Sequence, residues 1–357
     1  MDVLVADIQT VILTQYAPVH GPLWAMASRH WAQTFADYCA RAQLETDRYA
    51  MVWLGLLARA GCVELLRWIK KMRGPHRTRW PKNRIMCAAA RGGCEQLVRV
   101  CRDEWGERDA DGPMAAAAKG GHLALVRLCN IEWLASHIEW TARCAAKKGH
   151  DHIVRFCCEN HWCRTEHCSC AQGAMSMAAL GGHEQLVRWC YTHGGAHGVR
   201  AAMVYAANGG HERIMRICHD EWKATNVDQA MASAAAGGHV HIMRICHDEW
   251  GERNVNKAMG AAAASGHIDI VRLCHDTWGA TDVFGAMLYA AENGHIDIVR
   301  LCYDWWNVTE RDDCTFHELK KSAHIGANVE IIKLYRTWRA AFNSDKHASS
   351  LKKKEAP

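Results

Sequence analysis

The sequence predicts an all-α solenoid built from short helix–turn–helix repeats, on three recurring features. A Gly-His step recurs at His122, His150, His183, His211, His239, His267 and His295, and five of these six intervals are 28 residues long. An Ala-rich segment precedes each step, in most copies with a Met eight residues before the histidine. An amphipathic segment with a central arginine follows it. Units this short cannot bury an apolar face alone, so stacked copies are expected.

The repeats define three regions. Degenerate copies place Cys62, Cys94 and Asn328 in the histidine slot, so about ten copies fill residues 46–340. Residues 1–45 do not repeat. Residues 341–357 are polar and basic, with Lys352-Lys353-Lys354, and we expect a disordered tail there.

Each half of a repeat predicts one helix. The first half is rich in alanine, the best helix former, and its small side chains let helices approach closely. Glycine before the histidine suits a left-handed helix end. In the second half, Ile268, Ile270, Val271, Leu273 and Cys274 fall mostly at three- and four-residue steps, which indicates an amphipathic helix.

This pattern resembles the ankyrin repeat, whose Ala-Ala-x-x-Gly-His-x-x-Ile-Val-x-Leu core stands nearly intact at Ala290–Leu301. Two departures are clear. The family's Thr-Pro-Leu-His start is absent, and most copies are shorter than the usual length of about 33 residues. The missing residues lie where the family builds β-hairpin fingers, so few or no fingers are expected. Short arrays rich in Cys and Trp are similar to ankyrin proteins of large DNA viruses, which implies virus–host protein binding in the host cytoplasm.

The N-terminal segment, residues 1–45, leaves two interpretations open. It suits a helical cap that shields the first repeat, as solenoid ends require. It also resembles a degenerate F-box, a module that docks onto a Skp-type adaptor of cullin–RING ubiquitin ligases. The resemblance implies adaptor contacts from Leu4, Ile8, Ile12, Leu13, Leu23 and Trp31. With the array it implies a substrate receptor. The alternative is an ankyrin-type scaffold or decoy without a ligase link.

Target contacts are expected from loop residues that vary between copies, because the Ala-rich first helices offer a shallow face. These candidates are Arg108, Lys223, Asn226, Arg253, Asn254, Thr281 and Asp282. The recurring Arg and Trp are expected to stabilise the stack. Replacing Trp250 should therefore lower the melting temperature.

Charge and cysteine content indicate which partners and which cellular compartment to expect. Lysine plus arginine total 43 against 38 acidic residues, a small excess that disfavours a nucleic-acid surface and leaves nucleic-acid binding as a third alternative. No apolar run is long enough for a transmembrane helix, and no basic region precedes the first apolar stretch. Eight of the 18 cysteines recur at one repeat position, as small buried residues in a reducing compartment would. We expect a cytoplasmic protein without membrane contact; the lysine tail gives nuclear import weaker support.

Catalytic and metal sites receive little support from the sequence. His219-Asp220-Glu221 recurs as His247-Asp248-Glu249 because the repeat recurs, whereas catalysis needs one convergent constellation. No enzyme activity and no cofactor are expected. Cys163, His167, Cys168 and Cys170 are weak zinc candidates in a lengthened interval, since their spacing is not a standard ligand spacing. A cysteine-biased loop is the alternative.

Overall fold

The computed structural model describes residues 48–73, 81–160, 169–194, 198–306, 313–326 and 328–354. The ordered elements in this part of the chain are helices, and no strand occurs there. The predicted all-α repeat solenoid is confirmed to that extent. The F-box-like positions Leu4, Ile8, Ile12, Leu13, Leu23 and Trp31 lie outside the described residues.

Two compact units divide the chain, the first ending at Ser136. Its helices are α3 (Arg48–Arg59), α4 (Val63–Arg73), α5 (Lys82–Gly92), α6 (Glu95–Asp103), α7 (Asp111–Gly120), α8 (Leu123–Arg127) and the π-helical turn η1 (Leu128–Glu132). The first helices of successive repeats, α3, α5 and α7, pack against one another in sequence order.

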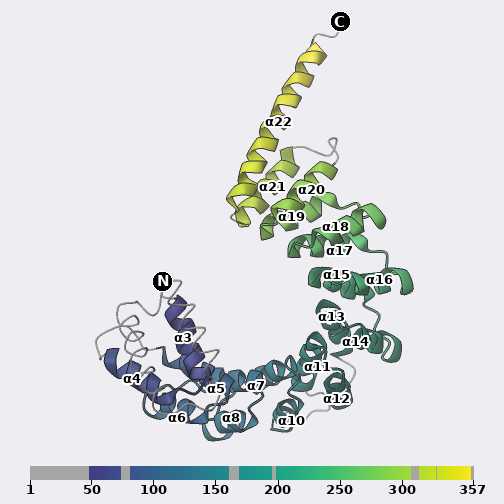
Figure 1. The fold of residues 1–357 in the computed structure, drawn as a ribbon. Helices are drawn as coiled ribbons and strands as arrows, with labels where there is room; N and C mark the ends of the chain where they lie inside the picture. Colours follow the sequence, from purple (N-terminus) through teal and green to yellow (C-terminus); the bar gives the residue numbers. More distant parts are fainter. Residues whose placement is uncertain are drawn as a thin grey trace, which may run out of the picture. The chain divides into compact units, whose positions relative to one another are not determined.

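The second unit begins at His137 and stacks repeats in the same way (Figure 1). Its helices are α9 (Ile138–Ala146), α10 (Asp151–Asn160), α11 (Ser169–Gly181), α12 (Glu184–Gly194), α13 (Val199–Gly209), α14 (Glu212–Arg216), η3 (Ile217–Glu221), α15 (Val227–Gly237), α16 (Val240–Arg244), η4 (Ile245–Glu249), α17 (Val255–Ser265), α18 (Ile268–Arg272), η5 (Leu273–Thr277), α19 (Val283–Asn293), α20 (Ile296–Trp305), α21 (Asp313–Ile325) and α22 (Val329–Lys354). The odd-numbered helices α9 to α21 form one row, with the second helices alongside.

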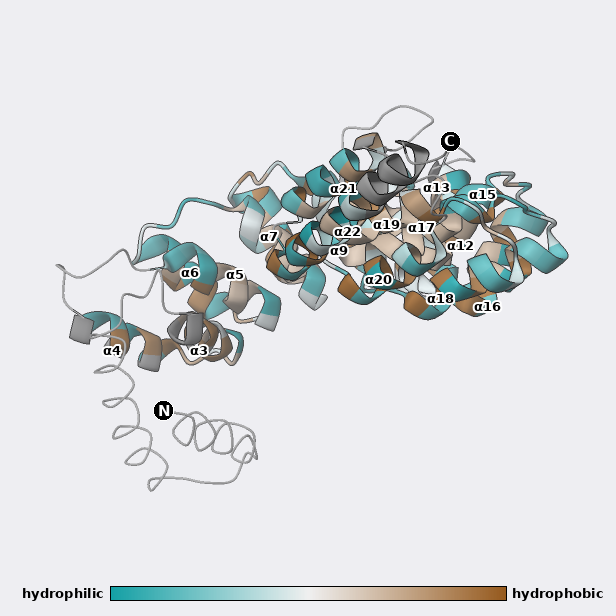
Figure 2. Cartoon of the chain, turned by 90° about the horizontal axis from the view of Figure 1, so that it is seen from above, coloured by the Kyte–Doolittle hydropathy of each residue, from teal (hydrophilic) through white to brown (hydrophobic). Residues whose placement is uncertain are grey.

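The first helices are held close by small side chains. Met231 and Ala234 of α15 are fully buried. Gly237 sits so near the preceding helix that a Cβ there would lie 2.3 Å from the Asn208 carbonyl oxygen. Gly238 then ends α15 with φ of 81°, the left-handed conformation that favours glycine. In Figure 2 the first helices α17 and α19 are pale to brown along their length.

The second helices bury one face, and several of them end in a π-helical turn, which is wider than an α-helical turn. Ile242, Met243 and Cys246 are fully buried, and burial raises the pKa of the Cys246 thiol to about 12. The last turn is π-helical, since the Trp250 N–H donates to the Ile245 carbonyl five residues earlier, at 3.1 Å. The cysteines at the recurring position are buried, as the sequence predicted.

The Gly-His histidines tie each repeat to the one before it. The Nε2–H of His239 donates to the Asn208 carbonyl at 3.0 Å. His122, His183, His211, His267 and His295 make the same contact, at 3.0 to 3.3 Å. Asn328 replaces the histidine with its own amide, which donates to the Gly294 carbonyl at 3.3 Å. These six histidines therefore have a structural role in the stack.

The C-terminal tail differs from the prediction. Helix α22 continues to Lys354, through most of the segment expected to be disordered from residue 341. Ala340, Ala341 and Lys352–Lys354 are good helix formers, so the helix continues although no side chain at 341–344 is fully buried. Polarity alone was therefore a poor guide to where this helix ends.

Candidate functional site

A row of arginine–glutamate pairs follows the second helices of unit 2. Arg188 of α12 makes a two-pronged contact with Glu221 of η3, at 2.8 and 2.9 Å, and also reaches Glu184 at 3.2 Å. Arg216 repeats this with Glu249, at the same two distances, and with Glu212 at 2.8 Å. Each arginine thus joins its own helix to the next repeat. We call this row the arginine ladder.

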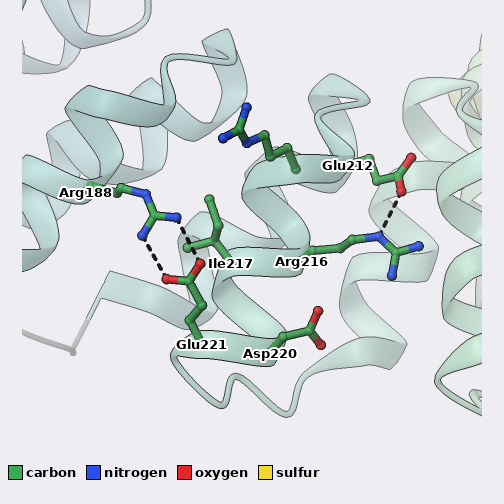
Figure 3. A pocket seen from close by; sticks show the side chains of 7 residues that line it. Arg188, Glu212, Arg216, Ile217, Asp220 and Glu221 are labelled. Atoms are coloured by element: carbon green, nitrogen blue, oxygen red, sulfur yellow. Dashed lines mark hydrogen bonds and ion pairs between the residues drawn. The ribbon is translucent and has the colours of Figure 1, made fainter.

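An open hollow of about 500 Å³ lies over the ladder (Figure 3). Arg188, Glu221, Arg216 and Glu212 line it, and their charged groups already face one another. The Arg188 guanidinium holds the pKa of the Glu221 carboxyl below its usual range. The charges of this hollow are satisfied within the protein, so the ladder here serves the stack.

A second row joins neighbouring repeats through flat stacking. The ring of His219 stacks on Trp250 of the next repeat, with centroids 3.9 Å apart, and His247 stacks on Trp278 at 4.5 Å. Tyr191 takes the histidine position against Trp222 at 4.0 Å. In unit 1 a cation fills it, with Lys70 over Trp105 and Arg102 over Trp133. These inter-repeat contacts support the stabilising role predicted for the recurring Trp. For the recurring Arg, the pairs made by Arg188 and Arg216 support it.

The recurring His-Asp-Glu sets have separate structural partners. His219 Nδ1 bonds the Asp220 carboxylate at 2.7 Å while its ring covers Trp250. Glu221 instead points to Arg188 (Figure 3). The three side chains therefore do not converge on one reacting point.

Large aromatic side chains stand exposed on the first helices of unit 2. Tyr205 of α13 is 38% exposed, Tyr289 of α19 is 52% exposed and Trp140 of α9 is 55% exposed. Tyr205 and Tyr289 occupy one register, six residues before the histidine, where the two repeats between them carry Ser233 and Ala261. We call the exposed side of α13, α15, α17 and α19 the first-helix face.

Local packing holds one of these tyrosines in place. A Cβ on Gly260 of α17 would come within 3.2 Å of the Tyr289 ring, so the glycine leaves room for the ring to lie across the neighbouring helix. Lys257 and Asp228 form an ion pair of 3.0 Å at the start of the same face. Lys257 thereby lowers the pKa of Asp228. The face combines exposed aromatic rings, small side chains and a few charges.

Among the predicted loop candidates, Asn226 is corrected by the structure. Its side chain is 2% exposed, and its amide donates to the Arg200 carbonyl at 3.0 Å. It therefore braces the start of α15 and is not available to a partner. Arg108 and Lys223 are exposed; Lys223 has φ of 57°, at a loop position where other copies have glycine.

The remaining loop candidates are exposed but lie in successive repeats. Arg253 donates to His247 Nε2 at 3.0 Å, and the Asn254 N–H donates to Glu252 at 2.7 Å. The Thr281 N–H donates to Asn256 at 2.7 Å, and Asp282 accepts from the Gly285 N–H at 2.9 Å as the N-cap of α19. These side chains shape the loops beside the first-helix face and do not gather into one pocket.

The zinc candidates gain no support from the described residues. Cys163, His167 and Cys168 lie outside them, while Cys170 is fully buried in α11. No group of three metal-ligating side chains occurs in the part of the chain that is described. Over the same residues, no helix is long and apolar enough to cross a membrane.

Sequence reasoning missed Tyr205 and Tyr289 because it looked for variation in the loops. The signal was present, since aligning the copies puts a large aromatic where other copies have Ser or Ala.

Comparison of the chain with known protein families and with characterised proteins finds no significant match.

Proposed function

We propose that the chain is a non-enzymatic protein that binds another protein along the first-helix face. The observation that supports this best is the exposure of Tyr205 and Tyr289 at a register where neighbouring copies carry small side chains. Exposed aromatic rings over a shallow apolar surface are typical anchors in protein interfaces. Stacked repeats offer such a surface over several helices.

The repeats are of ankyrin type in this proposal. Helix pairs joined by a Gly-His turn, with the histidine bonded to the preceding repeat, support that assignment. The shortened copies replace hairpin fingers with loops carrying Arg253, Asn254, Thr281 and Asp282. Those loops would border the bound partner.

The proposal has a second, more specific part, which is a link to ubiquitin ligases. It rests on the F-box-like pattern of residues 4–31, with Ile8, Ile12 and Trp31 facing a Skp-type adaptor and its cullin. The array would then hold a target while the N-terminus recruits the ligase. A scaffold without that link is the alternative.

Affinity capture from eukaryotic lysate tests both parts, with three baits side by side. Tyr205→Ser with Tyr289→Ala copies residues that the same register already carries, so it should keep the fold and lose target proteins. Ile8→Asp with Ile12→Asp and Trp31→Ala should keep the targets and lose the Skp-type adaptor and cullin. Identical prey from the wild type and the tyrosine variant would refute the proposed binding face. If none of the three baits captures ligase components, the scaffold without a ligase link becomes the supported function.

Nucleic-acid binding makes the opposite prediction. It would appear as a salt-sensitive gel shift that the tyrosine substitutions leave unchanged, because phosphate contacts come from cations.

A further inference from the structure

Two arginines of unit 2 have lost the carboxylates that their counterparts hold. Arg244 and Arg272 occupy the register of Arg188 and Arg216 in the arginine ladder. The two glutamates of each closed rung are replaced at these positions, by Val240 and Thr277 around Arg244, and by Ile268 and Trp305 around Arg272.

The guanidinium groups of this open part of the ladder face solvent. Arg244 and Arg272 are exposed, and within residues 198–306 neither forms an ion pair. Arg188 and Arg216, in contrast, are only 39% and 34% exposed at the side chain, although they carry the same charge. At both positions the arginine is present, and the two glutamates that would pair with it are absent.

The aspartates near the open arginines either bond a histidine or form no ion pair with Arg244 or Arg272. Asp248 and Asp276 each bond the Nδ1 of the preceding histidine, at 2.7 Å. Asp269 and Asp297 are exposed and form no ion pair with either arginine. Half-exposed Trp278 and Trp305 border the pair, each stacked on a histidine.

We propose that Arg244 and Arg272 bind two carboxylates of an acidic segment in a partner protein, as Arg188 and Arg216 bind Glu221 and Glu249. This inference rests on the proposed protein-binding function and places a second contact surface on the second helices. Guanidinium groups suit carboxylates because two parallel N–H donors match the two oxygens. Packed helices lie about 8–10 Å apart, and a chain in the polyproline II conformation has three residues per turn and rises about 3.1 Å per residue. Acidic residues three apart therefore fit the two arginines.

A partner with spaced carboxylates fits this surface better than a nucleic acid does. Four aspartates, Asp248, Asp269, Asp276 and Asp297, lie on η4, α18, η5 and α20 and would repel a continuous phosphate backbone. Half-buried Val240 and Ile268 lie beside the arginines and suit apolar side chains between the acidic ones.

Fluorescence anisotropy with the full chain tests the proposal. The probe is a short fluorescein-labelled peptide of repeating Glu-Ala-Val, and saturable binding is expected. Arg244→Gln with Arg272→Gln should weaken binding at least about tenfold, which corresponds to about 1.4 kcal/mol. Arg188→Gln with Arg216→Gln removes the same charge from closed rungs and should change it less than about twofold.

A second pair of variants keeps both open arginines. Val240→Glu with Thr277→Glu supplies Arg244 with its two missing carboxylates, so peptide binding should fall while the melting temperature holds or rises. Val240→Gln with Thr277→Gln is the neutral control and should bind as the wild type does.

Several outcomes would overturn the inference. These are no binding of the peptide, equal losses in the two arginine pairs, or tighter binding of labelled single-stranded DNA that depends on Arg244 and Arg272. The variant Tyr205→Ser with Tyr289→Ala should still bind the peptide. The proposed function and this inference can therefore fail separately, the first in protein capture and the second in anisotropy.

Discussion

The arginine ladder of unit 2 has a closed part and an open part, and the two use one residue differently. In α12 and α14, Arg188 and Arg216 hold glutamates of the next repeat. In α16 and α18, Arg244 and Arg272 hold none. The same cation is an internal cross-link in one pair of repeats and an exposed donor in the next. A recurring residue therefore does not have one role, because its role depends on which neighbours recur with it.

The largest effect should come from the aromatic row, which crosses both parts of the ladder. Trp250 covers His219 beside the closed rungs and Trp278 covers His247 beside the open ones. Trp250→Ala and Trp278→Ala should each lower the melting temperature by roughly 5–10 °C. The expected loss is about 2–3 kcal/mol, because these rings are less buried than a core Trp. Thermal unfolding followed by circular dichroism measures this, and an unchanged melting point in either variant would contradict the stacking role.

Acid should destabilise the stack at His239, because a protonated ring is disfavoured where it is buried. Burial lowers the pKa of this histidine, so the folded state favours the neutral ring that donates to the Asn208 carbonyl. A pKa below its unfolded value of about 6.5 gives stability that is present above that pH and is lost as the pH falls.

The variant His239→Asn provides the comparison for this pH effect. Asn328 shows that an amide can donate to the preceding repeat in place of the ring. The variant should therefore lose less stability than the wild type between pH 7 and pH 5, measured by chemical unfolding at each pH. Equal losses in the two proteins would exclude His239 as the titrating group.

A smaller effect should separate the closed rungs from the open ones. Arg216→Gln removes contacts to Glu212 and Glu249 and should lower the melting temperature slightly, whereas Arg244→Gln should leave it unchanged. The difference should vanish near 1 M salt, where the Debye length is about 3 Å. A salt-independent drop in both variants would mean that the aliphatic stems, and not the charges, stabilise the stack.

The smallest effect on stability is expected at the exposed tyrosines. Tyr205→Ser and Tyr289→Ala remove rings that are 38% and 52% exposed, and both substitutions copy a residue found in another repeat. The melting temperature should therefore remain equal to that of the wild type. A large drop would show that Tyr289 over Gly260 is a packing contact and not a binding one.

The repeat and its internal helices could be predicted because they depend on local periodicity. Gly-His steps, buried Met and amphipathic spacing each act within one copy, and the structure places them as expected. Contacts between copies were harder to predict. The partner of Arg188 is Glu221, 33 residues later, and the partner of His219 is Trp250, 31 residues later, so both pairs depend on how one repeat sits on the next.

The binding candidates show the same limit. Asn226 varies like a contact residue, yet it is buried because its amide braces the start of a helix. Tyr205 lies inside a helix that looked uniformly small, yet it protrudes because its register faces solvent. Burial at one loop position and exposure at one helical register follow from stacking, which a single copy does not contain.

Site-specific photocrosslinking would test most directly the claim that the first-helix face binds a partner while the stacked rows hold the repeats together. A photoreactive benzoylphenylalanine is placed at Tyr205, at Tyr289 and, as a control, at Tyr191, whose ring is stacked on Trp222. Irradiation in cells should give discrete heavier adducts from positions 205 and 289 and none from 191. Adducts from 191 alone, or no adduct from 205 and 289, would contradict the account.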